Sequence, residues 1–233
     1  MAYNITKIAD GIHMIDEDKF VQCYLIEGEE CAVLLDSCAG GGEDFQSSIL
    51  SLTDKPIRLV LSHSDTDHTG GQEYFGMPMM HPAEYARYIS KDGRGKPVEP
   101  LWEGQVIDLG GIKLEAVLIP GHTPGSIALI DRAARRLFVG DSVSDSHIYM
   151  FGDGRDLRAF STSMRKLEAM SPLVETIHPA HGTPSLPTEW LAKTRVAAEK
   201  LLNGELEQKE PPFDLPCKLY SAGEVSFLYQ AEA

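Results

Sequence analysis

Four potential metal ligands follow an apolar run early in the chain. Residues 57–61 are typical of a buried strand, and His63, Asp65, Asp67 and His68 come after them within six residues. Because alternate residues of an extended backbone project to one side, His63, Asp65 and Asp67 can converge, with His68 beside them. Imidazole and carboxylate together suit zinc, iron or manganese. A solvated turn is the alternative interpretation, since Ser, Asp, Thr and Gly are common in turns, but two His and two Asp at this spacing favour a metal site.

Three further polar side chains follow apolar runs in the second half of the chain. His122 lies in a turn bounded by Pro and Gly, Asp141 follows a run that ends at Val139, and His181 follows a run that ends at Ile177. Each signal is weak alone. Together they predict three more ligands at strand ends, beside the first cluster, where the loops at one edge of a rigid scaffold commonly carry a site.

The remaining histidines are weaker candidates. His178 is the alternative to His181 as the final ligand, but its place within the strand end and the Gly after His181 favour His181. His13, His81 and His147 are interpreted as surface or core histidines, although His147 follows Asp141 closely enough to line the same cleft.

The elements that must position these side chains are predicted from apolar periodicity and turn residues. Strands are expected at residues 12–15, 23–26, 31–35, 57–61, 105–109, 112–119, 126–130, 136–139, 174–177 and 225–229. Helices are expected at residues 43–52, shortly after 71, from about 82 to before 93, at 157–170 and at 187–202, and residues 92–101 are typical of a linker or surface loop. Two similar β-rich halves, each closing with a helix and a strand, predict two packed sheets with helices outside.

Composition narrows the class of protein. The chain has 233 residues, of which 42% are hydrophobic, so it can bury a core, and it contains no apolar run long enough to span a membrane. The N-terminal residues lack the pattern of a signal peptide, and the four cysteines have no CxxC spacing, so we expect a reducing, cytoplasmic location. The net charge of −14 argues against nucleic acid as a partner. Nothing in the sequence indicates an oligomeric state.

The order and spacing of the ligand candidates resemble the metallo-β-lactamase superfamily, whose fold is an αββα sandwich. The resemblance covers about residues 10–185, and the stretches around His122 and His181 are similar to the glyoxalase II-like branch. It implies an α+β fold of four layers, in one domain over residues 1–233. The metal-site core would span about 10–185, with a C-terminal helix and strand in 186–233.

The resemblance also implies two divalent metal ions, with zinc favoured and iron or manganese as alternatives. One ion would be held by His63, Asp65 and His122. The other would be held by Asp67, His68 and His181, with Asp141 bridging the two. Asp36, which ends an early strand, would support the site from behind the ligands.

The chain departs from the family at Asp65, where the usual first motif has a second His. Three carboxylates and a hydroxide would then balance two divalent ions to zero, against +1 in the usual set. This substitution favours harder ions such as iron or manganese. The flavodiiron reductases of the same superfamily carry Glu at this position and bind two irons.

The function implied is that of a metal-dependent hydrolase, in which a metal-bridging hydroxide attacks the carbonyl of an ester, thioester or lactone. Asp67 or a metal-bound water would carry the proton to the leaving group, and a small molecule is the expected substrate. His147, Tyr149 and Phe151 are weak candidates for substrate contacts. A di-iron oxidoreductase or oxygen- or NO-handling protein is one alternative, and a metal-binding protein without turnover is another. A β-lactamase and a nuclease are less favoured.

Overall fold

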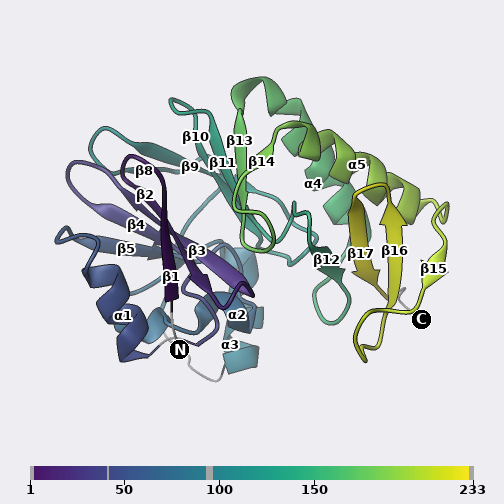
Figure 1. The fold of residues 1–233 in the computed structure, drawn as a ribbon, viewed down its shortest axis with the longest axis horizontal. Coiled ribbons are helices and arrows are strands. Elements are labelled where there is room, and N and C mark those ends of the chain that lie inside the picture. The colour runs from purple at the N-terminus through teal and green to yellow at the C-terminus, as the bar shows by residue number, and fades with distance from the viewer. Residues whose placement is uncertain (1–2, 41, 93–96, 231–233) are drawn as a thin grey trace.

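Two β-sheets packed face to face form the centre of this computed structural model, which describes residues 3–40, 42–92 and 97–230 (Figure 1). The first sheet has the order β1-β2-β3-β4-β5-β6-β7. Its strands are β1 (Tyr3–Ala9), β2 (Ile12–Glu17), β3 (Val21–Glu27), β4 (Ala32–Leu35), β5 (Ile57–Val60), β6 (Met79–Met80) and β7 (Glu99–Pro100).

The second sheet has the order β14-β13-β11-β10-β9-β8. Its strands are β8 (Val106–Asp108), β9 (Lys113–Leu118), β10 (Ile127–Asp131), β11 (Arg136–Gly140), β13 (Thr176–Pro179) and β14 (Leu186–Pro187). The helices are α1 (Glu43–Leu50), α2 (Thr66–Thr69), α3 (Tyr85–Asp92), α4 (Leu157–Ala169) and α5 (Glu189–Leu202). Among the described residues, none of these helices combines the length and apolar character needed to span a membrane.

The buried side chains separate into three layers, which explain why helices cover both outer faces. Tyr24 and Ile26 of β3 point between the sheets, whereas Cys23 and Leu25 point outward, because successive side chains of a strand alternate. The outward set packs on Phe45 of α1 and its neighbours. The outer face of the second sheet packs in the same way against α4 and α5. The result is the predicted αββα sandwich.

A strand–helix–strand unit occurs once in each half, as the internal repeat in the sequence predicted. β4 pairs in parallel with β5, and α1 lies between them in the chain. β11 pairs in parallel with β13, and α4 lies between them. The loops that leave β4, β5, β11 and β13 carry most of the candidate ligands, so the repeat determines where those ligands lie.

The C-terminal region and the segment after Asp141 differ from the prediction. No strand was predicted between residues 139 and 174, but this part of the chain contains β12 (His147–Met150). Residues 209–233 were expected to contain one strand. Their described part contains both β16 (Lys218–Ala222) and β17 (Val225–Tyr229), and with β15 (Gln208–Lys209) these form a third sheet of order β12-β17-β16-β15, next to α5 in Figure 1. Pairing between β12 and β17 joins residues 79 positions apart, which no local pattern reveals.

The other predicted elements agree to within a few residues, with local exceptions. The helix expected after Gly71 is a single 3₁₀ turn at Gln72–Tyr74, and β1 was missed. β1 is mostly exposed, so it lacks the apolar alternation that marks a half-buried strand. Residues 93–96 of the predicted linker lie outside the described residues, and β7 follows them.

Asp156→Ala should destabilise the fold by about 1 kcal/mol, because Asp156 caps α4. Its Oδ1 accepts hydrogen bonds from the backbone N–H groups of Arg158 at 2.8 Å and Ala159 at 2.9 Å. Thermal unfolding should show a melting temperature lower by roughly 2–4 °C. Asp214→Ala, which removes an exposed carboxylate from a loop, is the control and should leave the melting temperature unchanged. Equal effects of the two substitutions would contradict the capping role.

Candidate metal centre

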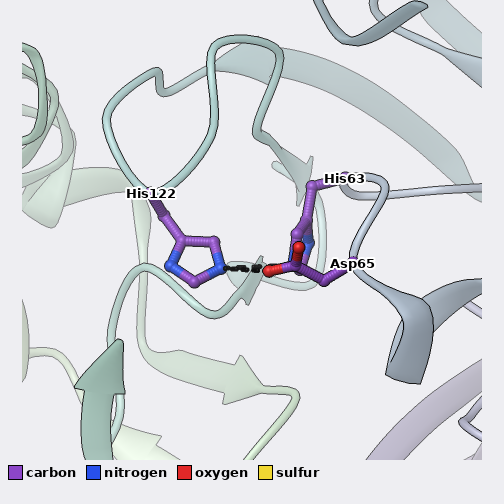
Figure 2. Close-up of side chains that lie close together, drawn as sticks. All are labelled: His63, Asp65 and His122. Carbon is purple, nitrogen blue, oxygen red and sulfur yellow. Dashed lines mark hydrogen bonds and ion pairs between the residues drawn. The ribbon is translucent and has the colours of Figure 1, made fainter. Parts of the chain in front are cut away.

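Three donor atoms converge in the first donor group, which we define as His63, Asp65 and His122 (Figure 2). The Oδ2 atom of Asp65 lies 3.4 Å from Nε2 of His63 and 3.3 Å from Nε2 of His122. The two imidazole nitrogens lie 3.2 Å apart. His63 and Asp65 come from the loop after β5, and His122 comes from the turn between β9 and β10.

The second donor group consists of Asp67, His68 and His181, and Asp141 lies between the two groups. Nε2 of His181 is 3.3 Å from Asp67 Oδ2, and Nε2 of His68 is 3.8 Å from the same oxygen. Asp141 approaches His68 at 3.2 Å, His181 at 3.3 Å and His122 at 3.4 Å. The structure therefore brings together all seven residues that the sequence singled out as ligands.

The spacing and burial of these donors fit divalent metal ions. Ligands bound tetrahedrally to zinc at about 2.0–2.1 Å are separated from each other by about 3.3–3.4 Å, and the contacts within the first donor group match that separation. Nε2 of His68 and Oδ1 of Asp141 are buried without a hydrogen-bond partner among the described residues, although they lie only 3.2 Å apart. Buried polar atoms without partners are costly, and a shared cation would satisfy both.

Backbone carbonyls orient two of the four imidazoles. Nδ1 of His122 lies 2.9 Å from the carbonyl oxygen of Tyr149, and Nδ1 of His181 lies 2.6 Å from that of Phe20. A carbonyl can only accept, so Nδ1 must donate in both cases. In the neutral ring this leaves the lone pair on Nε2, which points at the other donors.

Asp36 orients the other two imidazoles. Its Oδ2 atom lies 2.9 Å from Nδ1 of His68 and accepts a hydrogen bond of 2.7 Å from the hydroxyl of Ser62. Because that hydroxyl proton is used, the Ser62 oxygen is free to accept from Nδ1 of His63, 3.0 Å away. Oδ1 of Asp36 accepts from the backbone N–H of Ser62 at 2.7 Å. One buried carboxylate thus contacts one imidazole of each donor group, His68 directly and His63 through Ser62, and the supporting role of Asp36 stays a prediction.

The electrostatics of the donor groups also favour a cation. Burial alone would raise the pKa of Asp65, but its contacts with His122 and His63 hold that pKa well below the usual range. Burial and the nearby Arg155 guanidinium lower the pKa of His122 to about 4, so this ring is neutral at pH 7. For His181, burial opposes protonation, but the Asp141 and Asp67 carboxylates prevail and raise the pKa to about 10. In the second donor group a metal would take the place of protons.

The donor groups open into a cavity of about 670 Å³. His147 and Tyr149 line it, whereas Phe151 lines a neighbouring cavity of about 780 Å³. His178, the alternative final ligand, is in neither donor group. Its ring stacks on Phe138 at 4.9 Å, and its Nδ1 lies 3.0 Å from a backbone carbonyl.

Several residues of the centre escaped the sequence analysis. Phe20 and Phe213 line the cavity and are 58% and 61% exposed, but isolated aromatic residues in loops carry no sequence signal. Arg87 and Arg155 both form ion pairs with Asp65. The spacing of these two arginines in the sequence does not identify them as partners of Asp65.

The comparison with known families agrees with this geometry. The family model described as the metallo-β-lactamase superfamily matches residues 16–181, and the chain belongs to that superfamily. A metallo-β-lactamase from Pontibacter korlensis has a similar fold, with a TM-score of 0.73 and 20% sequence identity over 85% of this chain and 99% of that one. The predicted fold class is therefore confirmed, and the superfamily together with the His and Asp clusters indicates binding of divalent metal.

The curated relatives include proteins named as thioesterases. The acyl-coenzyme A thioesterase MBLAC2 of Gallus gallus is 29% identical over 157 residues, which cover 54% of this chain and 57% of that protein. The atrochrysone carboxyl ACP thioesterase AgnL7 of Paecilomyces divaricatus is 32% identical over 174 residues, 66% of this chain and 52% of that one. The human MBLAC2 is 28% identical over 225 residues, 77% of this chain and 81% of that protein. The chain thus spans little more than half the length of the first two relatives.

Asp36→Asn should weaken divalent metal binding by roughly 10- to 100-fold, as is typical when a residue that orients metal ligands is lost. Asp36 has a φ of 64°, a conformation that Asn tolerates, so the backbone should be retained. The substitution replaces one carboxylate oxygen with an amide NH₂ group. That group cannot accept the hydrogen bonds that Asp36 receives from Ser62 and His68. Competition titration against a chromogenic chelator measures the affinity.

The matched control for this prediction is Asp131→Asn. Asp131 is 3% exposed, against 2% for Asp36, and its carboxylate caps a turn at Ala133 and Ala134. It lies at the end of β10 opposite to the donor groups, so metal affinity should remain that of the parent. An unchanged affinity in Asp36→Asn, or an equal loss in both variants, would contradict the orienting role of Asp36.

Proposed function

We propose that this protein is a metal-dependent hydrolase that cleaves acyl thioesters. The observation that carries the proposal is the convergence of seven imidazole and carboxylate donors at one cavity. Two ions are proposed, one at each donor group with Asp141 between them, and zinc is favoured because four of the seven donors are imidazoles.

The relatives support the thioester class. The names of the chicken, bovine and human MBLAC2 proteins describe acyl-coenzyme A thioesterases, and AgnL7 is named as an atrochrysone carboxyl ACP thioesterase. In these names the scissile bond is a thioester, and the carriers differ. We therefore propose the thioester bond as the common feature and leave the acyl group to experiment.

When bound, divalent ions would supply an activated water as the nucleophile and polarise the carbonyl oxygen that is attacked. The residues of the chain would hold this centre in place. Asp36, Ser62 and the carbonyls of Phe20 and Tyr149 fix the imidazole rings, so no ligand has to reorganise during the reaction.

Asp67 is proposed to carry a proton from the nucleophile to the leaving group. It lines the cavity and is partly exposed, whereas Asp141 is more deeply buried. Burial opposes its ionisation, but His68 and His181 prevail and hold the pKa of Asp67 below its usual range. A thiolate is a good leaving group that needs little protonation, so a carboxylate that is seldom protonated suffices.

The acyl group is proposed to contact Phe20, Phe213 and Tyr149. Phe20 and Phe213 are exposed at the cavity, and Tyr149 contributes to its lining. Large exposed aromatic residues next to a site commonly contact an apolar ligand. This arrangement favours thioesters with an apolar acyl portion over small, fully polar ones.

Purified protein supplied with zinc should hydrolyse acyl thioesters, and a chelator should abolish the activity. His122→Ala removes one of the donors of the first donor group and should lower kcat/KM by at least about 10²-fold, because a metal-held nucleophile is lost. Release of free thiol from a panel of acyl thioesters, with lactones, phosphodiesters and β-lactams beside them, measures activity and class together.

His13→Ala is the control, since His13 lies on β2 and belongs to neither donor group. Its activity should equal that of the parent. Turnover in metal-replete His122→Ala at the parental rate would contradict the proposed metal centre. Hydrolysis of another substrate class, without hydrolysis of thioesters, would contradict the proposed substrate class. Iron with a visible absorption band and no hydrolysis would favour the oxidoreductase alternative.

A further inference from the structure

Four side chains of alternating charge, all largely buried, include Asp65 of the first donor group. In order they are Glu84, Arg87, Asp65 and Arg155, and we call them the ionic chain. Arg87 donates to Oδ1 of Asp65 and lies 3.4 Å from the Glu84 carboxylate. Arg155 donates to the other oxygen of Asp65, Oδ2, at 2.5 Å.

The ionic chain is electrically balanced and mostly buried, although Asp65 and Arg155 also line the cavity of the metal centre. Two guanidinium groups face two carboxylates, and the side chains are 0% exposed for Glu84, 9% for Arg87, 13% for Asp65 and 10% for Arg155. Removing one member of a buried set leaves an uncompensated charge in a low dielectric. Surface ion pairs contribute little, but these four groups depend on one another.

The ionic chain also joins the two loops that carry the first donor group. Glu84 accepts from the backbone N–H and the hydroxyl of Ser64, next to His63, and from the N–H of Gly125, at 2.8 Å, in the turn that holds His122. Arg155 donates its other terminal nitrogen to the carbonyl oxygen of His122. The loop after β5 and the turn between β9 and β10 are thus held at a fixed separation.

Asp65 still has the capacity to bind a metal in this arrangement. Each carboxylate oxygen has two acceptor positions. Oδ1 is directed at Arg87, while Oδ2 receives Arg155 on one side and faces the imidazole nitrogens of His63 and His122 on the other. The two terminal nitrogens of the Arg155 guanidinium donate to Asp65 and to the backbone carbonyl of His122, an arrangement that the single nitrogen of lysine does not match.

We propose that Arg87 and Arg155 are positioning residues that hold Asp65 as a ligand of the first metal and offset its charge. The inference rests on the proposed metal centre and names the residues that allow a carboxylate where relatives of the family carry an imidazole. Without the arginines, the Asp65 side chain could turn toward solvent and Oδ2 would leave the first donor group.

This inference changes the expected charge of the centre. From the sequence alone, Asp65 is an uncompensated negative charge that lowers the net charge of the metal pair to zero. With Glu84 balanced by Arg87, Arg155 supplies the charge that balances Asp65. The charge of Asp65 therefore no longer favours iron or manganese over zinc.

Cobalt titration of the metal-free protein tests the proposal without a substrate. Co²⁺ replaces zinc in sites of this type and gives visible bands that report its ligands. The variants are Arg155→Met, Arg87→Met and Arg155→Lys. The control is Arg195→Met, which breaks ion pairs with Glu168 and Glu199 on the helical face of the molecule.

In Arg155→Met and Arg87→Met, one of two equivalents of cobalt should bind at least about tenfold more weakly and with altered bands, while the other keeps its parental affinity. Arg155→Lys retains the charge, so its affinity for that equivalent of cobalt should lie between the affinities of Arg155→Met and the parent. Arg195→Met should match the parent. Parental or tighter binding of both equivalents in Arg155→Met would overturn the proposal, as would equal weakening of both, which a general structural defect would produce.

A second measurement keeps the test decisive if an arginine variant folds poorly. In the metal-free protein, Asp65→Asn and Arg155→Met should each lower the melting temperature. Combined, they should lower it by clearly less than the sum, because the second change removes the charge that the first left unpaired. Additive losses would overturn the pairing. Neither readout depends on thioester hydrolysis, so failure of the proposed substrate class leaves the inference standing.

Discussion

The arrangement of the metal centre depends on the hydrogen bonds of one buried carboxylate, that of Asp36. It lies directly after β4, yet its hydrogen bonds reach Ser62 after β5 and His68 on α2. The backbone supports the same connection, since the N–H of Gly70 donates to the carbonyl oxygen of Cys38 at 2.8 Å. A Cβ atom at Gly70 would lie 2.1 Å from the carbonyl oxygen of Ala39, so this close approach requires glycine.

The fold supplies the rigidity that such a carboxylate needs. The loops that carry the donors leave both sheets at the same edge of the sandwich. There the N–H of Ile127 in the second sheet donates at 2.9 Å to the carbonyl oxygen of Ser62, which follows β5 of the first sheet. The donors therefore come from loops anchored on two packed sheets and not from a single flexible segment. Because the three buried layers are closely packed, loops that are distant in sequence are held in fixed positions relative to one another.

Much of this could be predicted from the sequence, because local patterns carry it. The sandwich follows from alternating strands and two strand–helix–strand units, and the seven donors follow from polar residues at strand ends. The third sheet could not be predicted, since β12 pairs with β17 across the chain. Arg87 and Arg155 were missed for a related reason. They reach Asp65 from segments 22 and 90 positions away, and an isolated arginine is usually a surface residue.

The central claim is that the two donor groups hold two divalent ions, with Asp65 a ligand of the first. Anomalous diffraction from crystals grown with zinc, recorded on both sides of the zinc absorption edge, tests it most directly. The account predicts two anomalous peaks per chain. One should lie about 2 Å from Oδ2 of Asp65 and from Nε2 of His63 and His122, while Arg87 remains on Oδ1. A single peak at the second donor group, with Asp65 bound only to the arginines, would contradict it.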